Sequence, residues 1–181
     1  MTDTRIRFQQ EAVPHIDAAY NLARWLTRSA TEAEDIVQDA LLLAFRNFEA
    51  KRGSNTKAWL LAIVRNCFRM ARRRDAARPL RADGPDGSLE GAPPAALISA
   101  DDPERAAIAD ERARTLDAAL ARLSEDFREV LVLRELEGLS YQEIATVTDA
   151  PIGTVMSRLA RARAALRSGW PAGPGSANEL P

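Results

Sequence analysis

The chain has very few of the residues from which metal centres and disulfides are built. Its 181 residues include one cysteine, Cys67, and one histidine, His15. A single cysteine excludes an internal disulfide and a cysteine-rich zinc site. A single histidine leaves little for a metal cluster or a histidine-based catalytic pair, and no glycine-rich phosphate loop is present. We therefore expect no bound metal, no cofactor and no catalytic residue, which argues against an enzyme.

Long apolar runs are missing as well. No segment approaches the roughly 20 consecutive apolar residues that cross a membrane, and residues 1–17 lack the apolar stretch of a secretory signal. The overall balance, 46% hydrophobic and 28% charged, is that of an ordinary globular protein. These features predict a cytoplasmic protein that does not insert into a membrane.

The net charge of −1 conceals an uneven distribution of charge. Residues 65–81 contain seven arginines and a single acid, and residues 151–169 contain four arginines and no acid. Residues 104–149, in contrast, contain eleven acids and six arginines. Two separate basic patches on a nearly neutral chain suggest two contacts with a polyanion such as nucleic acid, although two solvated helix faces would give the same pattern.

The composition divides the chain into two helical parts. Residues 80–101 are rich in Gly, Pro, Ala and Asp and have no helical or strand period, which is typical of a flexible linker. On either side, alanine, leucine, arginine and glutamate predominate, as they do in helices. We predict an all-α fold of two small helical domains, at 8–78 and 104–168, with a flexible linker at 79–103 and a disordered tail at 169–181. The expected helices are 11–28, 32–48, 56–75, 104–121, 125–137, 141–148 and 152–168.

The clearest motif lies in the C-terminal domain. Ser140 and Glu143 have the spacing of a capping box, which begins a short helix. That helix ends near Asp149, a residue tolerated in a left-handed turn, and Pro151 opens the next helix. Two helices joined by so short a turn indicate a helix-turn-helix. The predicted buried stripe of the second helix is Ile152, Val155, Leu159, Ala162 and Leu166.

The residue types on another face of that second helix indicate DNA recognition. It carries hydroxyls and guanidinium groups and no acid, which suits hydrogen bonds to phosphates and to base edges in the major groove. An exposed arginine face on a structural helix is the alternative interpretation. The candidate DNA-binding residues are Thr154, Ser157, Arg158 and Arg161 on this face, together with Arg163 and Arg167, which flank it and are placed to hold phosphates.

The sequence of this domain resembles a known family. Residues 128–134 (REVLVLR), 143–145 (EIA) and 151–163 (PIGTVMSRLARAR) are similar to region 4 of the sigma-70 family, and more closely to its extracytoplasmic-function (ECF) group. The resemblance implies that this domain recognises the −35 promoter element as duplex DNA. Two positions depart from the family pattern: Met156 stands where Lys or Arg is usual, and Asp149 where Gly is common. The first departure is expected to remove a phosphate contact.

The N-terminal domain resembles region 2 of the same family. Residues 31–48 predict an amphipathic helix that begins with a capping box at Thr31 and Glu34, and Leu42 on its polar face hints at a docking surface. Its expected core stripe is Val37, Leu41, Ala44, Phe45 and Phe48. Residues 33–39 (AEDIVQD) resemble region 2.2, which implies docking on the largest catalytic subunit of RNA polymerase. The resemblance assigns that role to Asp35, Gln38, Asp39 and Arg46.

The following helix carries the first basic patch. Its outer stripe is expected to hold Arg65, Arg69, Arg72 and Arg73, with Asn66 beside it. Residues 59–66 (WLLAIVRN) resemble regions 2.3 and 2.4, which implies capture of unwound bases at the −10 element; a positive track for a single strand fits that role. Met70 stands where many members have Asp. The candidate −10 residues are Lys51, Arg52, Ser54, Asn55, Arg65, Asn66, Arg69, Arg72 and Arg73.

The predicted function is therefore that of a sigma factor, which binds core RNA polymerase and directs it to promoters without catalysis of its own. The partners that this implies are core RNA polymerase, promoter DNA and an anti-sigma protein. The main alternative is a stand-alone dimeric helix-turn-helix regulator that binds a palindromic operator, although it leaves the N-terminal resemblance unexplained. An interaction protein whose basic helices bind a protein rather than DNA is a further alternative.

Overall fold

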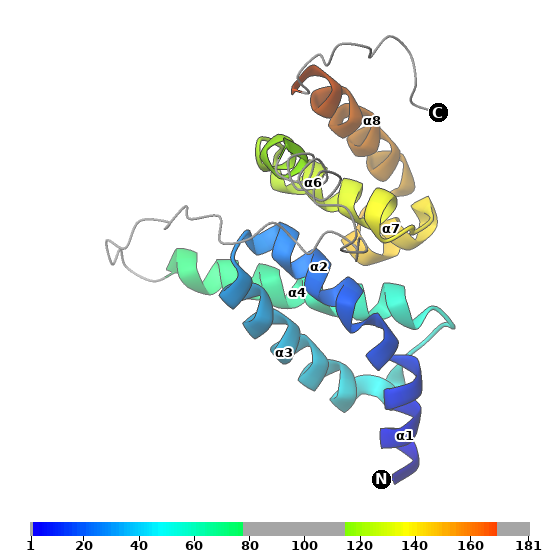
Figure 1. Ribbon diagram of the computed structural model, residues 1–181. Coiled ribbons are helices and arrows are strands. Elements are labelled where there is room, and N and C mark those ends of the chain that lie inside the picture. The colour runs from blue at the N-terminus through cyan, green and yellow to red at the C-terminus, as the bar shows by residue number, and fades with distance from the viewer. Residues whose placement is uncertain (1, 78–114, 170–181) are drawn as a thin grey trace, which may run out of the picture.

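The computed structural model describes residues 2–77 and 115–169, and both parts are helical, with no strand in either (Figure 1). This confirms the predicted all-α fold. The predicted linker, the start of the helix expected at 104–121 and nearly all of the predicted tail lie outside the described residues. The elements are α1 (Thr2–Glu11), the 3₁₀ turn η1 (Val13–His15), α2 (Ile16–Thr27), α3 (Ala30–Asn47), the 3₁₀ turn η2 (Phe48–Ala50), α4 (Thr56–Ala77), a helical segment at 115–121, α6 (Glu125–Leu131), the π-helix η3 (Val132–Leu136), α7 (Tyr141–Thr148) and α8 (Ile152–Gly169). None of the described helices has the length and apolar character needed to cross a bilayer.

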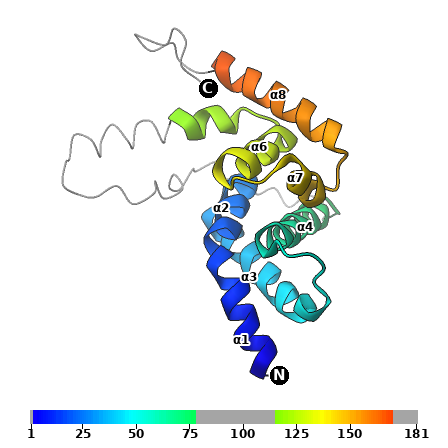
Figure 2. The same cartoon turned by 90° about the vertical axis from the view of Figure 1, so that its right-hand side faces the viewer.

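Three helices form the N-terminal domain. α2, α3 and α4 each pack against the other two (Figures 1 and 2). The buried side of α3 consists mainly of small residues at helical spacing, which lets its neighbours approach closely. These buried residues are Ala33, Ile36, Val37, Ala40 and Ala44.

α1 was not predicted from the sequence, because its apolar residues follow no helical stripe. It is attached to the bundle by Phe8, whose ring meets Phe45 and Phe48 edge-on at centroid distances of 5.3 and 5.4 Å. The prediction that Phe45 lies in the core is wrong: the residue is 43% exposed. The reason is that Phe45 lies at the rim of the bundle, where one side of its ring meets Phe8 and the other meets solvent.

α3 begins two residues earlier than the sequence predicted. Ser29 is its N-cap, and the Ser29 Oγ accepts a hydrogen bond from the Glu32 N–H at 3.3 Å. The capping box expected at Thr31 and Glu34 is therefore wrong, and Thr31 is an exposed residue of the first turn. Both Ser29 and Thr31 precede a Glu by three residues, so spacing alone could not choose between them.

The C-terminal domain contains a continuous helical stretch followed by the helix-turn-helix. α6 runs directly into η3, where the Glu137 N–H donates to the Val132 carbonyl, five residues back, at 3.0 Å. Gly138, with φ of +70°, then allows the chain to turn into α7. The helix predicted at 125–137 is thus confirmed, and its last part is a π-helix.

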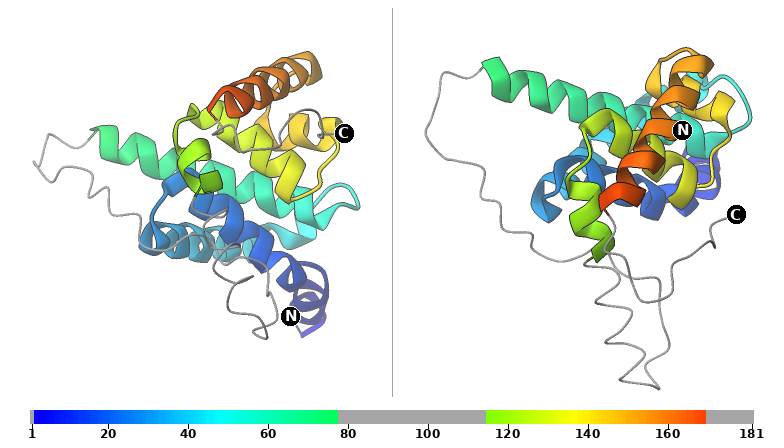
Figure 3. Two further views of the ribbon diagram at one scale, coloured as in Figure 1. Left: turned by 45° about the horizontal axis from the view of Figure 1, so that its top comes forward. Right: turned by 90° about the horizontal axis from the view of Figure 1, so that it is seen from above.

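The two domains pack against each other. α4 contacts α7, and α2 contacts α6 (Figure 3). One cluster of buried apolar residues runs through both domains and includes Leu60 and Leu61 of α4 together with Ile144 of α7. This contact was not predicted from the sequence, and it decides which of the candidate site residues are exposed.

Candidate nucleic-acid interface

The predicted helix-turn-helix is present. The Ser140 Oγ accepts from the Glu143 N–H at 3.3 Å, and the Glu143 carboxylate accepts from the Ser140 N–H at 2.7 Å, which confirms the capping box at the start of α7. The bond from the Ser140 N–H to the carboxylate is the main reason that the pKa of Glu143 is lowered, and the Ser140 and Asn55 side chains lower it further. α7 ends at Asp149, whose φ of 49° is left-handed, and the Pro151 carbonyl accepts the first backbone bonds of α8.

α8 packs against α6 and α7 through one side and leaves the other side open. The predicted stripe is buried at Val155, Leu159 and Ala162. Ile152 is a correction, since it is exposed: it lies in the first turn of α8, and with Ala145 of α7 it lines a shallow groove rather than the core. The open side of α8 is therefore free to meet a ligand.

The candidate −35 residues fall into two groups. Ser157, Arg161 and Arg167 are exposed, and the two arginines make no ion pair with another described residue. Thr154 is half-buried, and its carbonyl accepts from the Ser157 Oγ at 3.0 Å.

The other two arginines of the set are held within the domain. Arg158 pairs with Asp126 of α6 at 2.7 Å. Arg163 donates from Nε and Nη2 to one Glu135 carboxylate oxygen at 3.0 and 2.6 Å, and these bonds raise its pKa. The structure thus brings all six candidates to one helix, with Arg158 and Arg163 held in place by acids.

The basic side of α4 is partly covered. Asn66, Arg69, Arg72 and Arg73 are exposed, as predicted. Arg65 is a correction: it was expected on the outer stripe, but it is 2% exposed and its Nε donates to the Glu129 carboxylate at 2.6 Å. The reason is that α6 and α7 lie against this part of α4, which the sequence of α4 alone could not reveal.

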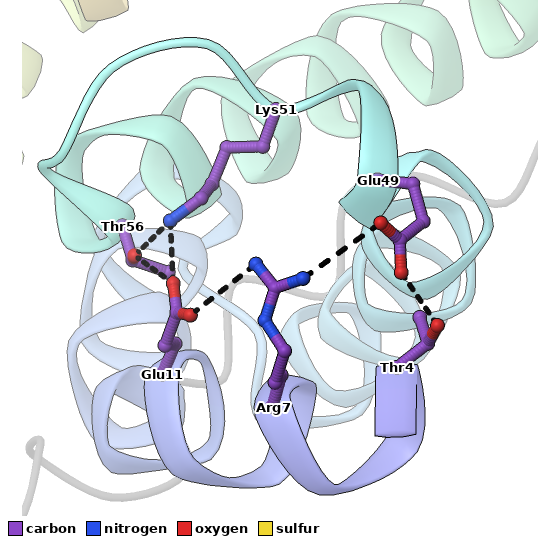
Figure 4. A network of polar contacts seen from close by, with 6 residues as sticks. All are labelled: Thr4, Arg7, Glu11, Glu49, Lys51 and Thr56. Carbon is purple, nitrogen blue, oxygen red and sulfur yellow. Dashed lines mark hydrogen bonds and ion pairs between the residues drawn. The ribbon is translucent and has the colours of Figure 1, made fainter. Parts of the chain in front are cut away.

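The candidate residues in the loop before α4 also differ in exposure. Arg52 and Ser54 are exposed, whereas Lys51 is tied into the fold. Its Nζ lies 2.7 Å from the Glu11 carboxylate and 2.6 Å from the Thr56 Oγ1, in a network that joins α1 to the loop (Figure 4). The bond from Lys51 is the main reason that the pKa of Glu11 is lowered. The Glu11 carboxylate therefore competes with DNA phosphate for the ammonium group of Lys51.

Three acids of the C-terminal domain meet the start and middle of α4. The Glu129 carboxylate is bound by Arg65, as described above. Lys57 Nζ donates to the Glu137 carbonyl at 2.8 Å and also lies 2.8 Å from the Glu137 carboxylate. The Asn55 side-chain amide donates to the Glu143 carboxylate, while its oxygen accepts from the Ala58 N–H at 2.9 Å and caps α4. Acidic side chains thus occupy part of the surface that the sequence assigned to the −10 element.

Glu129 is the most enclosed of these acids, at 4% exposed. Its burial raises its pKa, and this effect outweighs the attraction of Arg65, which acts in the opposite direction. The ion pair therefore affects the contact between the domains in two opposite ways. The attraction between the two charges stabilises the contact, and the loss of water from the carboxylate destabilises it.

A buried arginine adds a second contact between the domains. The Arg128 guanidinium donates to the carbonyls of Leu120 and Leu123 at 3.0 and 2.9 Å, and to that of Ala121 at 3.3 Å. It also donates to the carbonyl of Trp25, near the end of α2, at 3.3 Å. Carbonyls at helix ends have no partner within their own helix, so one side chain satisfies the ends of helices from both domains.

The candidate polymerase-binding residues lie together on α3. Asp35, Gln38, Asp39 and Arg46 are all exposed, and Leu42 among them is 53% exposed. A groove runs beside them between α3 and the distal half of α4, where Phe68 and Ala71 form part of its wall. An apolar residue in the middle of a charged, exposed helix face is typical of a docking surface.

Comparisons with known proteins agree with both halves of this arrangement. Residues 13–78 match the family description "Sigma-70 region 2", and residues 113–166 match "Sigma-70, region 4". The RNA polymerase sigma-H factor of Pseudomonas aeruginosa is 40% identical over 142 residues, which cover 76% of this chain and 72% of that protein. The ECF RNA polymerase sigma factor EcfG of Rhodopseudomonas palustris is 36% identical over 156 residues, which cover 86% and 78%.

The chain belongs to the ECF group of the sigma-70 family. As a sigma factor it directs promoter-specific initiation by RNA polymerase, and sigma factors as a family are initiation factors rather than enzymes. The stand-alone helix-turn-helix regulator is therefore the wrong alternative, since region 2 accompanies region 4 in the family's order.

Two solved structures resemble this sigma factor over most of its length. One is the sigma factor RpoE in complex with the anti-sigma factor NepR from Bartonella quintana, with a TM-score of 0.68 and 30% identity over 90% of this chain and 96% of that one. The other is CnrH in complex with the cytosolic domain of CnrY, with a TM-score of 0.62 and 25% identity over 91% and 87%.

The contacts between the domains are what the sequence interpretation of this sigma factor missed. A signal was nevertheless present at Arg128 and Glu129, two charged residues that directly precede the apolar run Val130–Leu133. Charged residues are almost never fully buried without a partner. Their place on a buried helix predicts that each has a polar or charged partner, but it does not say on which helix that partner lies.

Proposed function

We propose that three exposed surfaces of this sigma factor divide its work. The open side of α8, with Ser157, Arg161 and Arg167, recognises the −35 element in the major groove. The basic side of α4, with Arg69, Arg72 and Arg73, binds the unwound −10 strand together with Asn66 and the loop residues Arg52 and Ser54. The α3 surface of Asp35, Gln38, Asp39, Leu42 and Arg46 binds core polymerase.

The observation that supports this division is the exposure pattern of the helices. α3 and α8 each bury one stripe and present a polar or basic face to solvent, and the distal half of α4 keeps a basic face exposed; those faces hold most of the candidate residues. Basic faces suit phosphate contacts, which supply most of the affinity for DNA. RNA synthesis then belongs to the polymerase, and this chain needs no catalytic group, metal or cofactor; it works in the cytoplasm, where the polymerase works.

We further propose that the packed arrangement is a closed form that opens on the polymerase. The −35 and −10 elements lie about 25 base pairs apart, or about 85 Å at about 3.4 Å per base pair. A compact chain of 181 residues is about 40 Å across. Since Arg65 and Asn55 are also engaged by acids of the C-terminal domain, the two domains have to separate before both elements are bound.

An anti-sigma protein is a partner that fits this closed form. Two structures that resemble this chain over about 90% of its length are complexes: the sigma factor RpoE is bound by the anti-sigma factor NepR, and CnrH is bound by the cytosolic domain of CnrY. We propose that an anti-sigma protein binds this chain and stabilises the contact between its domains. A purified candidate partner should then lower the affinity of this sigma factor for core polymerase.

The experiment that tests the proposed function is run-off transcription with purified core RNA polymerase on a pool of promoter fragments. Discrete transcripts are expected only when this protein and the core enzyme are both present. Arg161→Ala should weaken initiation by roughly five- to 150-fold, as expected for loss of one good base contact of about 1–3 kcal/mol. Leu136→Ala, in η3 and outside all three surfaces, is the matched control and should leave initiation unchanged. Equal loss in both variants, or no transcript at all, would refute the assignment.

A further inference from the structure

Two apolar residues near the start of α8 are exposed rather than packed in the core. Met156 is 51% exposed, and Ile152, one turn earlier, is exposed as well. Met156 lies outside the buried stripe of Val155, Leu159 and Ala162, by which α8 packs on the rest of the domain, whereas Ile152 lies in the first turn and lines the groove beside α7. α8 itself lies at the outer edge of the molecule (Figure 2).

A glycine beside these side chains is not required by the fold. A Cβ at Gly153 would meet no atom within 4 Å. Nor does its backbone adopt the left-handed conformation that favours glycine, unlike that of Gly53 and Gly138. Glycine weakens a helix relative to alanine. A glycine with no internal reason points to an approach from outside, because its missing side chain leaves room for another molecule close to Met156.

The arginines of α8 leave this apolar start uncovered. Arg158 and Arg163 are held by Asp126 and Glu135. Arg161 is exposed farther along α8, which contains no acid that would repel phosphate. A DNA duplex placed on α8 therefore meets an arginine in the middle of the helix and a thioether at its start.

Base chemistry selects a partner for a methionine in this position. Among the base edges in the major groove, thymine alone presents an apolar group, its C5-methyl, and the remaining groups are hydrogen-bond donors and acceptors. Methionine cannot donate a hydrogen bond, and its flexible, polarisable side chain packs well against small apolar groups. The N-terminal residues of a recognition helix are the ones that contact base edges.

We propose that Met156 is a specificity-determining residue, whose side chain contacts the C5-methyl group of a thymine in the −35 element. The inference rests on the proposed role of α8 in recognising that element. It predicts that the promoters of this sigma factor carry a thymine at the position beneath the first turns of α8. It also replaces the phosphate contact of the usual Lys or Arg by a contact with a base.

Replacement of thymine by deoxyuridine tests this contact, because it removes only the methyl group. The −35 sequence is first selected by transcription with the full-length protein and core polymerase from a library with a randomised −35 region. Each thymine of the selected sequence is then replaced by deoxyuridine, and the affinity of the holoenzyme is measured. One replacement should weaken binding by the wild type about fourfold, the effect of removing one buried methyl group. Met156→Ala holoenzyme should bind the two promoters equally.

Two further variants distinguish loss of the contact with the thymine methyl group from a general loss of promoter affinity. Leu136→Ala, which removes a similarly exposed apolar side chain outside the site, should keep the fourfold preference for thymine. Met156→Arg should lose that preference and show a steeper salt dependence, because it adds a phosphate contact. The inference is overturned if Met156→Ala keeps the preference, or if no deoxyuridine replacement weakens the wild type. A holoenzyme that selects no promoter at all would instead refute the proposed function.

Discussion

Truncation of Glu129 is the sharpest test of the closed arrangement. Glu129→Ala leaves the buried Arg65 guanidinium without its partner. Removal of one member of a buried pair destabilises a structure by about 3–5 kcal/mol, chiefly because the other charge stays buried and unpaired. Because burial already raises the pKa of Glu129, the lower end of that range is the better expectation.

The effect should fall on the contact between the domains rather than on either domain. Arg65 regains its hydration when α4 separates from α6, so the open form avoids most of the cost. A change of about 3 kcal/mol shifts the ratio of closed to open molecules by about 150-fold. When only the open form binds the polymerase, the apparent dissociation constant falls as the open fraction rises. Glu129→Ala should therefore bind core polymerase more tightly than the wild type, by up to that factor.

Small-angle X-ray scattering measures the opening, and titration with labelled core polymerase measures the affinity. Glu129→Ala should have a larger radius of gyration than the wild type. Glu135→Ala is the matched control, because it removes an exposed ion pair with Arg163 inside the C-terminal domain, an interaction worth at most about 1 kcal/mol. A Glu129→Ala protein with the radius of gyration and polymerase affinity of the wild type would refute the reasoning. The double variant Arg65→Met and Glu129→Leu should close again, since apolar replacements of a buried pair are often neutral or stabilising.

Three further predictions concern single residues. Ser140→Ala removes the N-cap of α7 and should lower the free energy of unfolding by about 1 kcal/mol in urea titrations. Glu143 has a lowered pKa in the folded chain, so it contributes stability above its ordinary value of 4.5 that is lost as pH falls through the lowered pKa; Glu143→Gln should flatten this part of the acid-unfolding curve followed by circular dichroism. Leu42→Asp should weaken binding to core polymerase at least tenfold while the melting temperature stays near that of the wild type, because Leu42 is exposed on α3.

The sequence predicted the helices of both domains well because their signals are local. The capping box at Ser140 and the left-handed turn at Asp149 depend on residues three or four positions apart, and both are present in the structure. The same holds for the exposed surface of α3, since alternation of apolar and polar residues on one helix fixes which side is buried. The division into domains at 8–78, 79–103, 104–168 and 169–181 stays a prediction, and so do the individual roles of the candidate site residues.

The errors arose where a distant part of the chain decides the outcome. Arg65 has the helical phase of an exposed residue on α4, and it is buried because α6 supplies Glu129 from 64 positions away. Lys51 looked like a free basic loop residue, but Glu11 of the unpredicted α1 holds it. Periodicity within a helix identifies the side that faces its own domain, and it contains no information on a second domain that covers the opposite side.

The composition of the contact between the domains suits a surface that has to open. An interface made only of large apolar side chains would be more stable when closed, but in the open form it would expose an apolar patch that favours aggregation. Here the contact between the domains includes the buried Arg65–Glu129 pair and the Lys57–Glu137 pair as well as apolar residues of α4 and α7. The carboxylates engage Arg65 and Lys57 on the side of α4 that we propose binds DNA, so this part of the helix would become available to DNA only when the domains separate. The hydration that these carboxylates lose opposes the closed form, which lowers the binding energy that the polymerase and promoter would have to supply in the proposed opening.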